Sequence, residues 1–341
     1  MSNAGGGRGL QAGVALVSGL ILAAALWADS IAGRDQLIQL TDARANLAVH
    51  EAAMQLDDFI QRVSVLPVTT ASRQQILGNT PDPMMVEYLR SVIAKVPEDE
   101  VYGIYLAYED MKWSDKNSMP WMDRRNAPEM TVVHYDYHAP EQDWYSGAKT
   151  DGKLHITEPY FDAGGSDINM VSVTHPVILA DGHFVGVAGA DLSLELIQKI
   201  VDRIETNFWY AGGETETDHE MIRHAYLVSR NGLVVTHPDG SLMLSKDSPG
   251  ARVESLPDGK VTLETPNGFA KVDIGSDHRR VYWATSASTG WKLILNVSDA
   301  EVMRPVQRLA MKSLFVAALG LVALLGLFAA TARSVTRPRS G

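Results

Sequence analysis

Two uncharged apolar runs near the ends of the sequence constrain the chain most. Residues 10–28 read LQAGVALVSGLILAAALWA and residues 313–332 read SLFVAALGLVALLGLFAATA, with no charged side chain in either run. A helix of about 20 apolar residues is long enough to cross the hydrocarbon core of a bilayer, which is about 30 Å thick. We therefore expect two transmembrane helices, at 10–28 and 313–332.

The basic residues beside these runs predict their orientation. Arg8 precedes the first run, and Arg333, Arg337 and Arg339 follow the second. The positive-inside rule then places both ends in the cytoplasm and the residues between the runs in the periplasm, at a bacterial inner membrane. The first run could also be a cleaved signal peptide, but the LWA before Asp29 lacks the small-x-small cleavage pattern, which favours an uncleaved anchor.

Composition narrows the classes of partner. The chain of 341 residues has a formal net charge of -11 and no cysteine, which disfavours nucleic acid and excludes disulfides and thiolate metal sites. His134, His138, His155 and His175 lie in one region, but their spacing matches no compact metal motif. Nucleophile-elbow, phosphate-loop and Rossmann motifs are missing, so we expect neither a metal nor another cofactor, and no catalysis.

The part between the apolar runs predicts an α+β fold. Residues 30–66 have helical apolar spacing, with no Gly between Arg34 and Arg62, and indicate one long stalk helix that could pair in a homodimer. Residues 83–95 predict a second helix and residues 101–109 a strand. Turn pairs at Asp181-Gly182, Asn231-Gly232 and Thr289-Gly290 each divide two strand-like runs, which indicates hairpins in a twice-repeated antiparallel sheet.

Five segments resemble one family, the double Cache sensor domains of bacterial chemoreceptors and sensor kinases. They read DWYSGA, EPYFDA, GVAGADLSLELI, SRNGLVVTHPD and STGWKLILNV. The resemblance implies two PAS-like modules: a membrane-distal ligand-binding module at 97–201 and a membrane-proximal one at 223–297. Chemotaxis signalling, histidine phosphorylation or cyclic-dinucleotide synthesis can sit behind such a domain, and we expect cytoplasmic signalling partners to act through an output domain that the residues after Arg333 do not contain.

The amino-acid-binding members of this family have a pocket motif that can be carried over by position. It falls on Tyr137, Gln142, Trp144, Tyr160, Asp162 and Asp191, with Tyr145 adjacent to Trp144. Gln142 stands where the family has an Arg that binds the ligand carboxylate. A neutral Gln cannot supply that charge.

The remaining groups favour a cation. Two carboxylates in a closed pocket repel each other unless a cation lies between them, and each aromatic face attracts a cation by about 0.5 to 2 kcal/mol. We therefore expect a small cationic ligand such as an amine, a polyamine or a quaternary ammonium compound. The protein that binds it is expected to be the sensor region of a transmembrane signalling receptor, a chemoreceptor, rather than an enzyme.

Other interpretations stay open from the sequence. Arg124, Arg125 or Lys149 could replace the missing Arg and admit an amino acid, the ligand could be a neutral metabolite, or the module could recognise a periplasmic binding protein. Trp144 and Tyr145, adjacent aromatics beside a strand, could be core. Asp191 could be a helix N-cap and Asp162 a turn residue, and Gln142 could lie on the surface.

Overall fold

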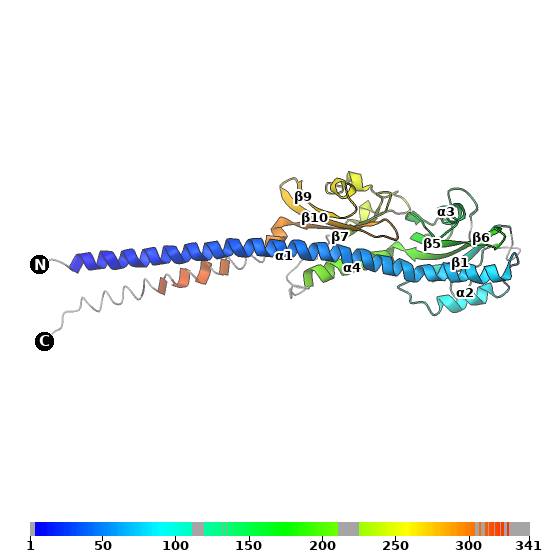
Figure 1. Ribbon diagram of the computed structural model, residues 1–341, viewed down its shortest axis with the longest axis horizontal. Coiled ribbons are helices and arrows are strands. Elements are labelled where there is room, and N and C mark those ends of the chain that lie inside the picture. Colours follow the sequence, from blue (N-terminus) through cyan, green and yellow to red (C-terminus); the bar gives the residue numbers. More distant parts are fainter. Residues whose placement is uncertain are drawn as a thin grey trace. The chain divides into compact units, whose positions relative to one another are not determined.

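The computed structural model describes residues 4–110, 119–131, 133, 135–210 and 225–303, with scattered positions between 307 and 326. For residues 4–32 and 204–210, the structure describes only the helical backbone and not the side chains. Residues 45–296 form one compact unit, and residues 1–44 with 297–341 form another. The helices are α1 (Ala4–Leu77), α2 (Met85–Ile93), α3 (Asp143–Asp151) and α4 (Leu194–Tyr210), shown in Figure 1.

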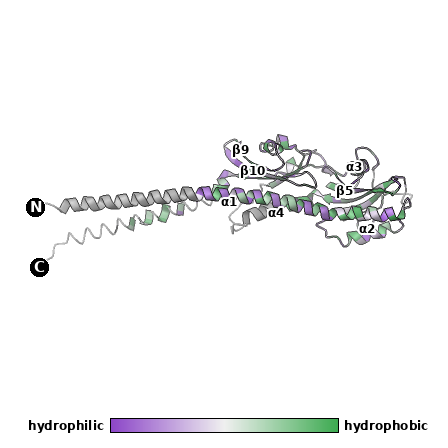
Figure 2. Cartoon of the chain, viewed as in Figure 1, coloured by the Kyte–Doolittle hydropathy of each residue, from purple (hydrophilic) through white to green (hydrophobic). Residues whose placement is uncertain are grey.

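Helix α1 extends beyond the predicted end of the stalk helix. It continues through Pro67 to Leu77, eleven residues past 66, so the predicted boundary is wrong. Packing explains the extension, because Thr70, Ala71 and Gln74 are all buried. The Gln74 amide donates to the carbonyls of Gly78 and Thr80, at 3.0 and 2.7 Å, and these bonds hold the end of the helix. Along its described side chains, α1 alternates hydrophilic and hydrophobic residues (Figure 2).

The predicted membrane spans are not tested by the described residues. Within the part of the chain that the structure describes, no helix is both long and apolar enough to cross a bilayer. Residues 10–28 lie in α1, but their side chains fall outside the description, as does part of 313–332. Both spans therefore stay predictions.

The first sheet is antiparallel and six-stranded. Its strands are β1 (Gly103–Tyr108), β2 (Trp121–Asp123), β3 (His155–Ile156), β4 (Tyr160–Phe161), β5 (Asn169–Ile178) and β6 (Phe184–Ser193). They lie in the order β2-β1-β6-β5-β3, and β4 pairs with β5. The predicted hairpin at Asp181-Gly182 is confirmed: it joins β5 to β6, and Gly182 takes the positive φ of 86° that such a turn needs.

The second sheet has five strands: β7 (Ala225–Val228), β8 (Val234–Thr236), β9 (Gly268–Ile274), β10 (Asp277–Thr285) and β11 (Lys292–Ser298). Its order, β8-β7-β11-β10-β9, repeats that of the first sheet when β4, which lies off the main path of that sheet, is left out of the count. Both predicted turns, at Gly232 and Gly290, have positive φ. This confirms the predicted α+β class with two PAS-like antiparallel sheets.

We call the first sheet with α3 the first module and the second sheet the second module; the boundaries 97–201 and 223–297 stay predictions.

Polar contacts join the two modules. Arg230, in the turn between β7 and β8, donates to the Ile156 carbonyl at 2.6 Å and forms an ion pair with Glu158 at 3.0 Å. The Asn169 amide donates to the Leu244 carbonyl at 2.8 Å. Residues 156 and 158 belong to the β3–β4 segment, so the second module contacts the same segment that supplies residues to the site described below.

Asp57 joins α1 to the turn between β10 and β11. Its carboxylate accepts hydrogen bonds from the backbone N–H groups of Ala287 and Ser288, at 3.1 and 2.9 Å, and from the hydroxyls of Ser286 and Ser288. Burial opposes ionisation, but these donors outweigh it and hold the pKa of Asp57 below its ordinary value. The helix is thus fixed to the second module at this turn.

We predict that Gly189→Ala destabilises the first sheet. Gly189 on β6 lies opposite Tyr105 on β1, and a Cβ at Gly189 would lie 2.1 Å from the Tyr105 ring. The ring would have to move, and overpacking of this kind costs about 1 to 3 kcal/mol of unfolding free energy. Urea unfolding of the full chain measures the loss. Gly240→Ala is the matched control, because a Cβ there meets nothing within 4 Å; equal effects of the two substitutions would contradict this account.

Candidate functional site

A small, partly open cavity lies within the first module. Its volume is about 10 Å³, which is room for about one water molecule. Its walls come from β1, β2, β4, β6, the start of α3 and the intervening loops. The lining residues are Tyr105, Met119, Trp121, Tyr135, Trp144, Tyr160, Asp162 and Asp191. Aromatic rings and two carboxyl groups therefore make up nearly the whole lining.

Asp191 is the more deeply buried of the two carboxyl groups. It lies on β6, is 2% exposed, and accepts a hydrogen bond from the Ser172 hydroxyl on β5 at 2.7 Å. Burial raises its pKa well above the ordinary value, the Ser172 bond opposes this rise, and the charges of Asp162 and Asp123 add to it. Because Asp191 lies within a strand, the N-cap interpretation is wrong; the Ser193 hydroxyl instead accepts from the Leu196 N–H near the start of α4.

Asp162 follows β4 and has several partners. It accepts from the Ser166 N–H at 2.6 Å, from the Ser166 hydroxyl at 2.9 Å, and from the Tyr135 hydroxyl at 2.9 Å. The Ser166 bonds close the turn after β4, so the turn interpretation of Asp162 is confirmed. The same carboxylate also lines the cavity.

Trp144 forms an aromatic wall of the cavity. It is the second residue of α3 and packs edge-to-face on Tyr105, with ring centroids 5.0 Å apart. Tyr137 and Tyr145 lie behind it, at 5.9 and 5.7 Å from the Trp144 ring. Tyr145 donates to Glu109 at 2.6 Å and Tyr137 to the Tyr108 carbonyl at 2.8 Å, so these two hydroxyls point to other partners.

The structure thus divides the seven predicted site residues into two groups. Trp144, Tyr160, Asp162 and Asp191 line the cavity. Tyr137, Tyr145 and Gln142 do not line it; Gln142 precedes α3 and accepts a hydrogen bond from the Trp144 indole at 3.2 Å. Whether any of the seven contacts a ligand stays a prediction.

Sequence reasoning missed four lining residues, Tyr105, Met119, Trp121 and Tyr135. Tyr135 was missed because Tyr137 lies two positions later in the same TVVHYDYH segment and was chosen instead. Trp121 and Tyr105 lie on paired strands. The alternation of side chains between the two faces of β1 was the signal that could have identified Tyr105 as a lining residue. The buried Trp121 N–H and Tyr105 hydroxyl lie near Asp191 and Ser172, but neither is aligned for a hydrogen bond.

The three cations proposed as substitute clamps are occupied elsewhere. Arg124 donates to the carbonyls of Ile93, Val96, Pro97 and Val101. Arg125 donates to the carbonyls of Gly165 and Ser166, both at 2.9 Å, and Lys149 forms an ion pair with Glu109. None of the three lines the cavity, and its described lining contains no cationic side chain.

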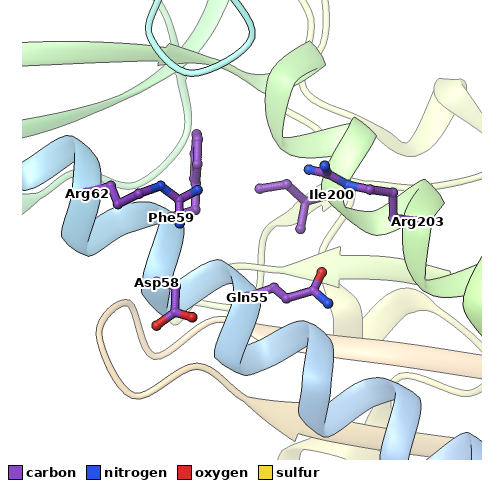
Figure 3. A pocket seen from close by; sticks show the side chains of 6 residues that line it. All are labelled: Gln55, Asp58, Phe59, Arg62, Ile200 and Arg203. Carbon is purple, nitrogen blue, oxygen red and sulfur yellow. The ribbon is translucent and has the colours of Figure 1, made fainter. Parts of the chain in front are cut away.

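A larger hollow lies between α1 and α4 and differs in character. Its volume is about 180 Å³, and it is lined by Gln55, Asp58, Phe59, Arg62, Ile200 and Arg203 (Figure 3). Phe59 and Ile200 are buried, whereas Arg62 and Arg203 are exposed. Two arginines against one aspartate make this hollow unsuited to a cation.

The histidines do not converge on a metal. His138 lies near the Tyr108 carbonyl, His155 between two aspartates, and His175 beside the Pro176 carbonyl, while His134 lies outside the described residues. The part of the chain that the structure describes holds no group of three or more His, Asp or Glu side chains placed to bind a metal ion.

Two sheets of matching strand order beside a long helix, with a small cavity in the first, form a tandem of PAS-like modules. Residues 86–199 match the family model of the methyl-accepting chemotaxis protein-like, first PDC sensor domain. The resemblance to double Cache sensor domains is therefore confirmed for residues 86–199, the part of the chain that this model matches.

Relatives and solved structures agree with this assignment. The chain is 31% identical over 140 residues to the methyl-accepting chemotaxis protein PscA of Pseudomonas syringae pv. tomato, covering 41% of this chain and 19% of that protein. The extracellular domain of the histidine kinase mmHK1S-Z2 has 19% identity and a TM-score of 0.61, over 77% of this chain and 99% of that one.

The ligand-binding domain of Mlp24 with asparagine has 19% identity and a TM-score of 0.54, over 80% of this chain and 98% of that one. At these identities the likeness to solved structures concerns the fold alone. The matched parts amount to between 19% and 29% of the curated relatives, so the chain spans less than a third of their length.

We predict that Asp191→Asn stabilises the protein increasingly as pH rises. A raised folded-state pKa favours the native state below the unfolded pKa of about 3.9, and this advantage is lost as pH rises toward the folded pKa. Asn is neutral at every pH and can still accept from Ser172. The free energy of unfolding of the variant should therefore rise relative to that of the parent between pH 4 and 8, by up to about 1.4 kcal/mol per pH unit, and thermal melts at each pH should show its midpoint rising accordingly.

Asp247→Asn, which changes an exposed carboxylate, provides the control. A constant difference between Asp191→Asn and the parent across this range would mean that Asp191 is ionised throughout.

Proposed function

We propose that the first module binds a small cationic amine in the aromatic cavity, with the ammonium group between Asp162 and Asp191. One observation carries the proposal: two buried carboxyl groups share a described lining that holds no cationic side chain. Buried carboxylates are normally paired with a cation. An ammonium ligand would supply that partner and would also contact the faces of Trp144 and Tyr160.

Several features favour an amine over an ordinary amino acid. Gln142 offers no charge to a carboxylate, and Arg124, Arg125 and Lys149 are held in other contacts. By contrast, the Mlp24 domain, which is similar in fold, was solved with the amino acid asparagine. An amino acid would need a cation at the cavity that the described lining does not contain.

Binding requires the cavity to enlarge. At about 10 Å³ it does not accommodate even a small amine, so a wall must move outward. Trp144 stands at the beginning of α3, which makes α3 the wall best placed to move. A ligand shifts such an equilibrium only through unequal affinity for the closed and open forms.

We further propose that this module is the periplasmic part of a membrane-anchored receptor with two spans, at 10–28 and 313–332. In this proposal the protein is a homodimeric chemoreceptor, and cytoplasmic signalling partners read the position of its last helix. The family match of residues 86–199 supports the chemoreceptor over a kinase or a cyclase.

We predict that amines bind more tightly as pH rises. Asp191 must release its proton to pair with an ammonium ion, so the dissociation constant should fall by up to about tenfold per pH unit below the pKa of Asp191. Isothermal titration of the full chain in detergent, with a panel of primary, poly- and quaternary amines at pH 6, 7 and 8, measures this. Asp191→Asn should weaken binding by about thirtyfold or more.

Asp247→Asn is again the control and should bind like the parent. If no amine binds at any pH, the proposed ligand class is wrong.

We predict that Gln142→Arg shifts the preference toward amino acids. The guanidinium would stand beside Trp144, where it can bind a carboxylate in a bidentate manner and repel a simple amine. Thermal shift with matched pairs, an amino acid and its decarboxylated amine, gives the ratio of the two affinities. Amino-acid binding by the parent would show that the carboxylate has another partner.

The second candidate is a protein-recognition module, and the nearly closed cavity favours it. In that case the cavity is core, and a periplasmic binding protein docks on the surface. Asp191→Ala would then leave every small-molecule response unchanged, whereas the amine proposal requires that response to be lost.

A further inference from the structure

His155 connects the two ends of α3. Its Nε2 lies 3.0 Å from Asp143 Oδ2, and its Nδ1 lies 2.8 Å from Asp151 Oδ2. Asp143 is the first residue of α3 and Asp151 the last. The His155 side chain, on β3, is 10% exposed. One imidazole therefore contacts both carboxylates that bound the helix.

The ring also abuts the middle of the helix. A Cβ added at Gly147 would lie 2.4 Å from His155 Nε2, so the ring lies directly against the helix backbone there. Contacts at the beginning, the middle and the end of α3 leave the helix little freedom to move away from β3. Trp144, beside Asp143, is consequently held against the cavity.

The number of α3 ends to which His155 can donate a hydrogen bond depends on the charge of its imidazole. A protonated imidazolium donates from both nitrogens, so it satisfies both aspartates. A neutral imidazole donates from one nitrogen and presents a lone pair at the other, which faces a carboxylate and repels it. Loss of one proton thus removes one of the two connections.

Other charged groups near His155 do not replace it. Arg230, from the second module, adds a favourable charge at Asp143, but its own bonds go to Ile156 and Glu158. On β5, the residue paired with His155 is the neutral Thr174. Asp143 and Asp151 are therefore the groups that govern the charge of His155.

We propose that the His155 clasp on Asp143 and Asp151 makes the first module a pH sensor, in which protonation closes α3 over the cavity and deprotonation frees it. This second input does not depend on the nature of the ligand. It acts on the same moving wall, so pH and ligand would converge on α3.

The pH range over which the clasp is complete follows from the titrations of His155 and Asp143. The hydrogen bond to Asp143 raises the pKa of His155 above 6.5, against the effect of burial, and the contact with Asp151 adds to the rise. The clasp is therefore complete below pH 6.5 and is lost as pH rises through the higher folded-state pKa. The bond to His155 also lowers the pKa of Asp143, so this contribution is lost only when the pH falls below the ordinary aspartate range.

Hydrogen exchange of the α3 amides in the full chain, without ligand, tests the proposal. Between pH 5.5 and 8.5, after correction for intrinsic exchange rates, the amides of residues 147–151 should lose protection in one step above pH 6.5. Each unit by which the clasp raises the pKa of His155 corresponds to about a tenfold loss. His155→Gln should exchange fast at all pH values, and His183→Gln, at an exposed turn histidine, should behave like the parent.

Asp151→Asn provides a second variant in case His155→Gln fails to fold. It removes one of the two carboxylate partners of His155 at a partly exposed position, so the step should shrink and move to lower pH. The proposal is overturned if the parent shows no step, if the step persists in His155→Gln, or if Asp151→Asn leaves it unchanged. Since no amine is present, these outcomes are independent of the amine proposal.

Discussion

The burial of Asp191 is the constraint on which the first module depends. A buried carboxyl group among aromatic rings is favourable only when it is protonated or faces a cation, and the Ser172 hydroxyl meets only part of its hydrogen-bonding need. Asp191 is part of the strand ladder, because it is paired with Gly103 of β1 on one side and with Ser172 of β5 on the other. The site thus lies in the middle of the sheet core rather than on its surface.

The sequence predicted the fold where local signals were strong. Turn glycines with positive φ located the hairpins, and the pocket motif implied by the family resemblance named Trp144, Tyr160, Asp162 and Asp191, half of the cavity lining. Helix α3 was missed because Ser146, Gly147 and Thr150 are weak helix formers and its aromatic pair suggested packing beside a strand. Its Gly152, with a positive φ of 64°, was the available end signal.

The misplaced residues share one physical cause. Tyr135 and Tyr137 are separated by two positions, and only tertiary packing decides which hydroxyl reaches Asp162 and which reaches the Tyr108 carbonyl. Likewise, α1 continues beyond Pro67 because Gln74 is bonded inside the domain, which no local pattern records. Long-range contacts settled both cases against the local expectation.

The Arg230 bridge limits how such a receptor can be recombined. Arg230 grips the carbonyl of Ile156 and the carboxylate of Glu158, both on the segment between His155 and Tyr160. A chimaera that joins this first module to a second module from another protein would lose these contacts unless that module supplied an equivalent arginine. The two modules therefore form a matched pair, in which the acceptor segment and its arginine have to be exchanged together.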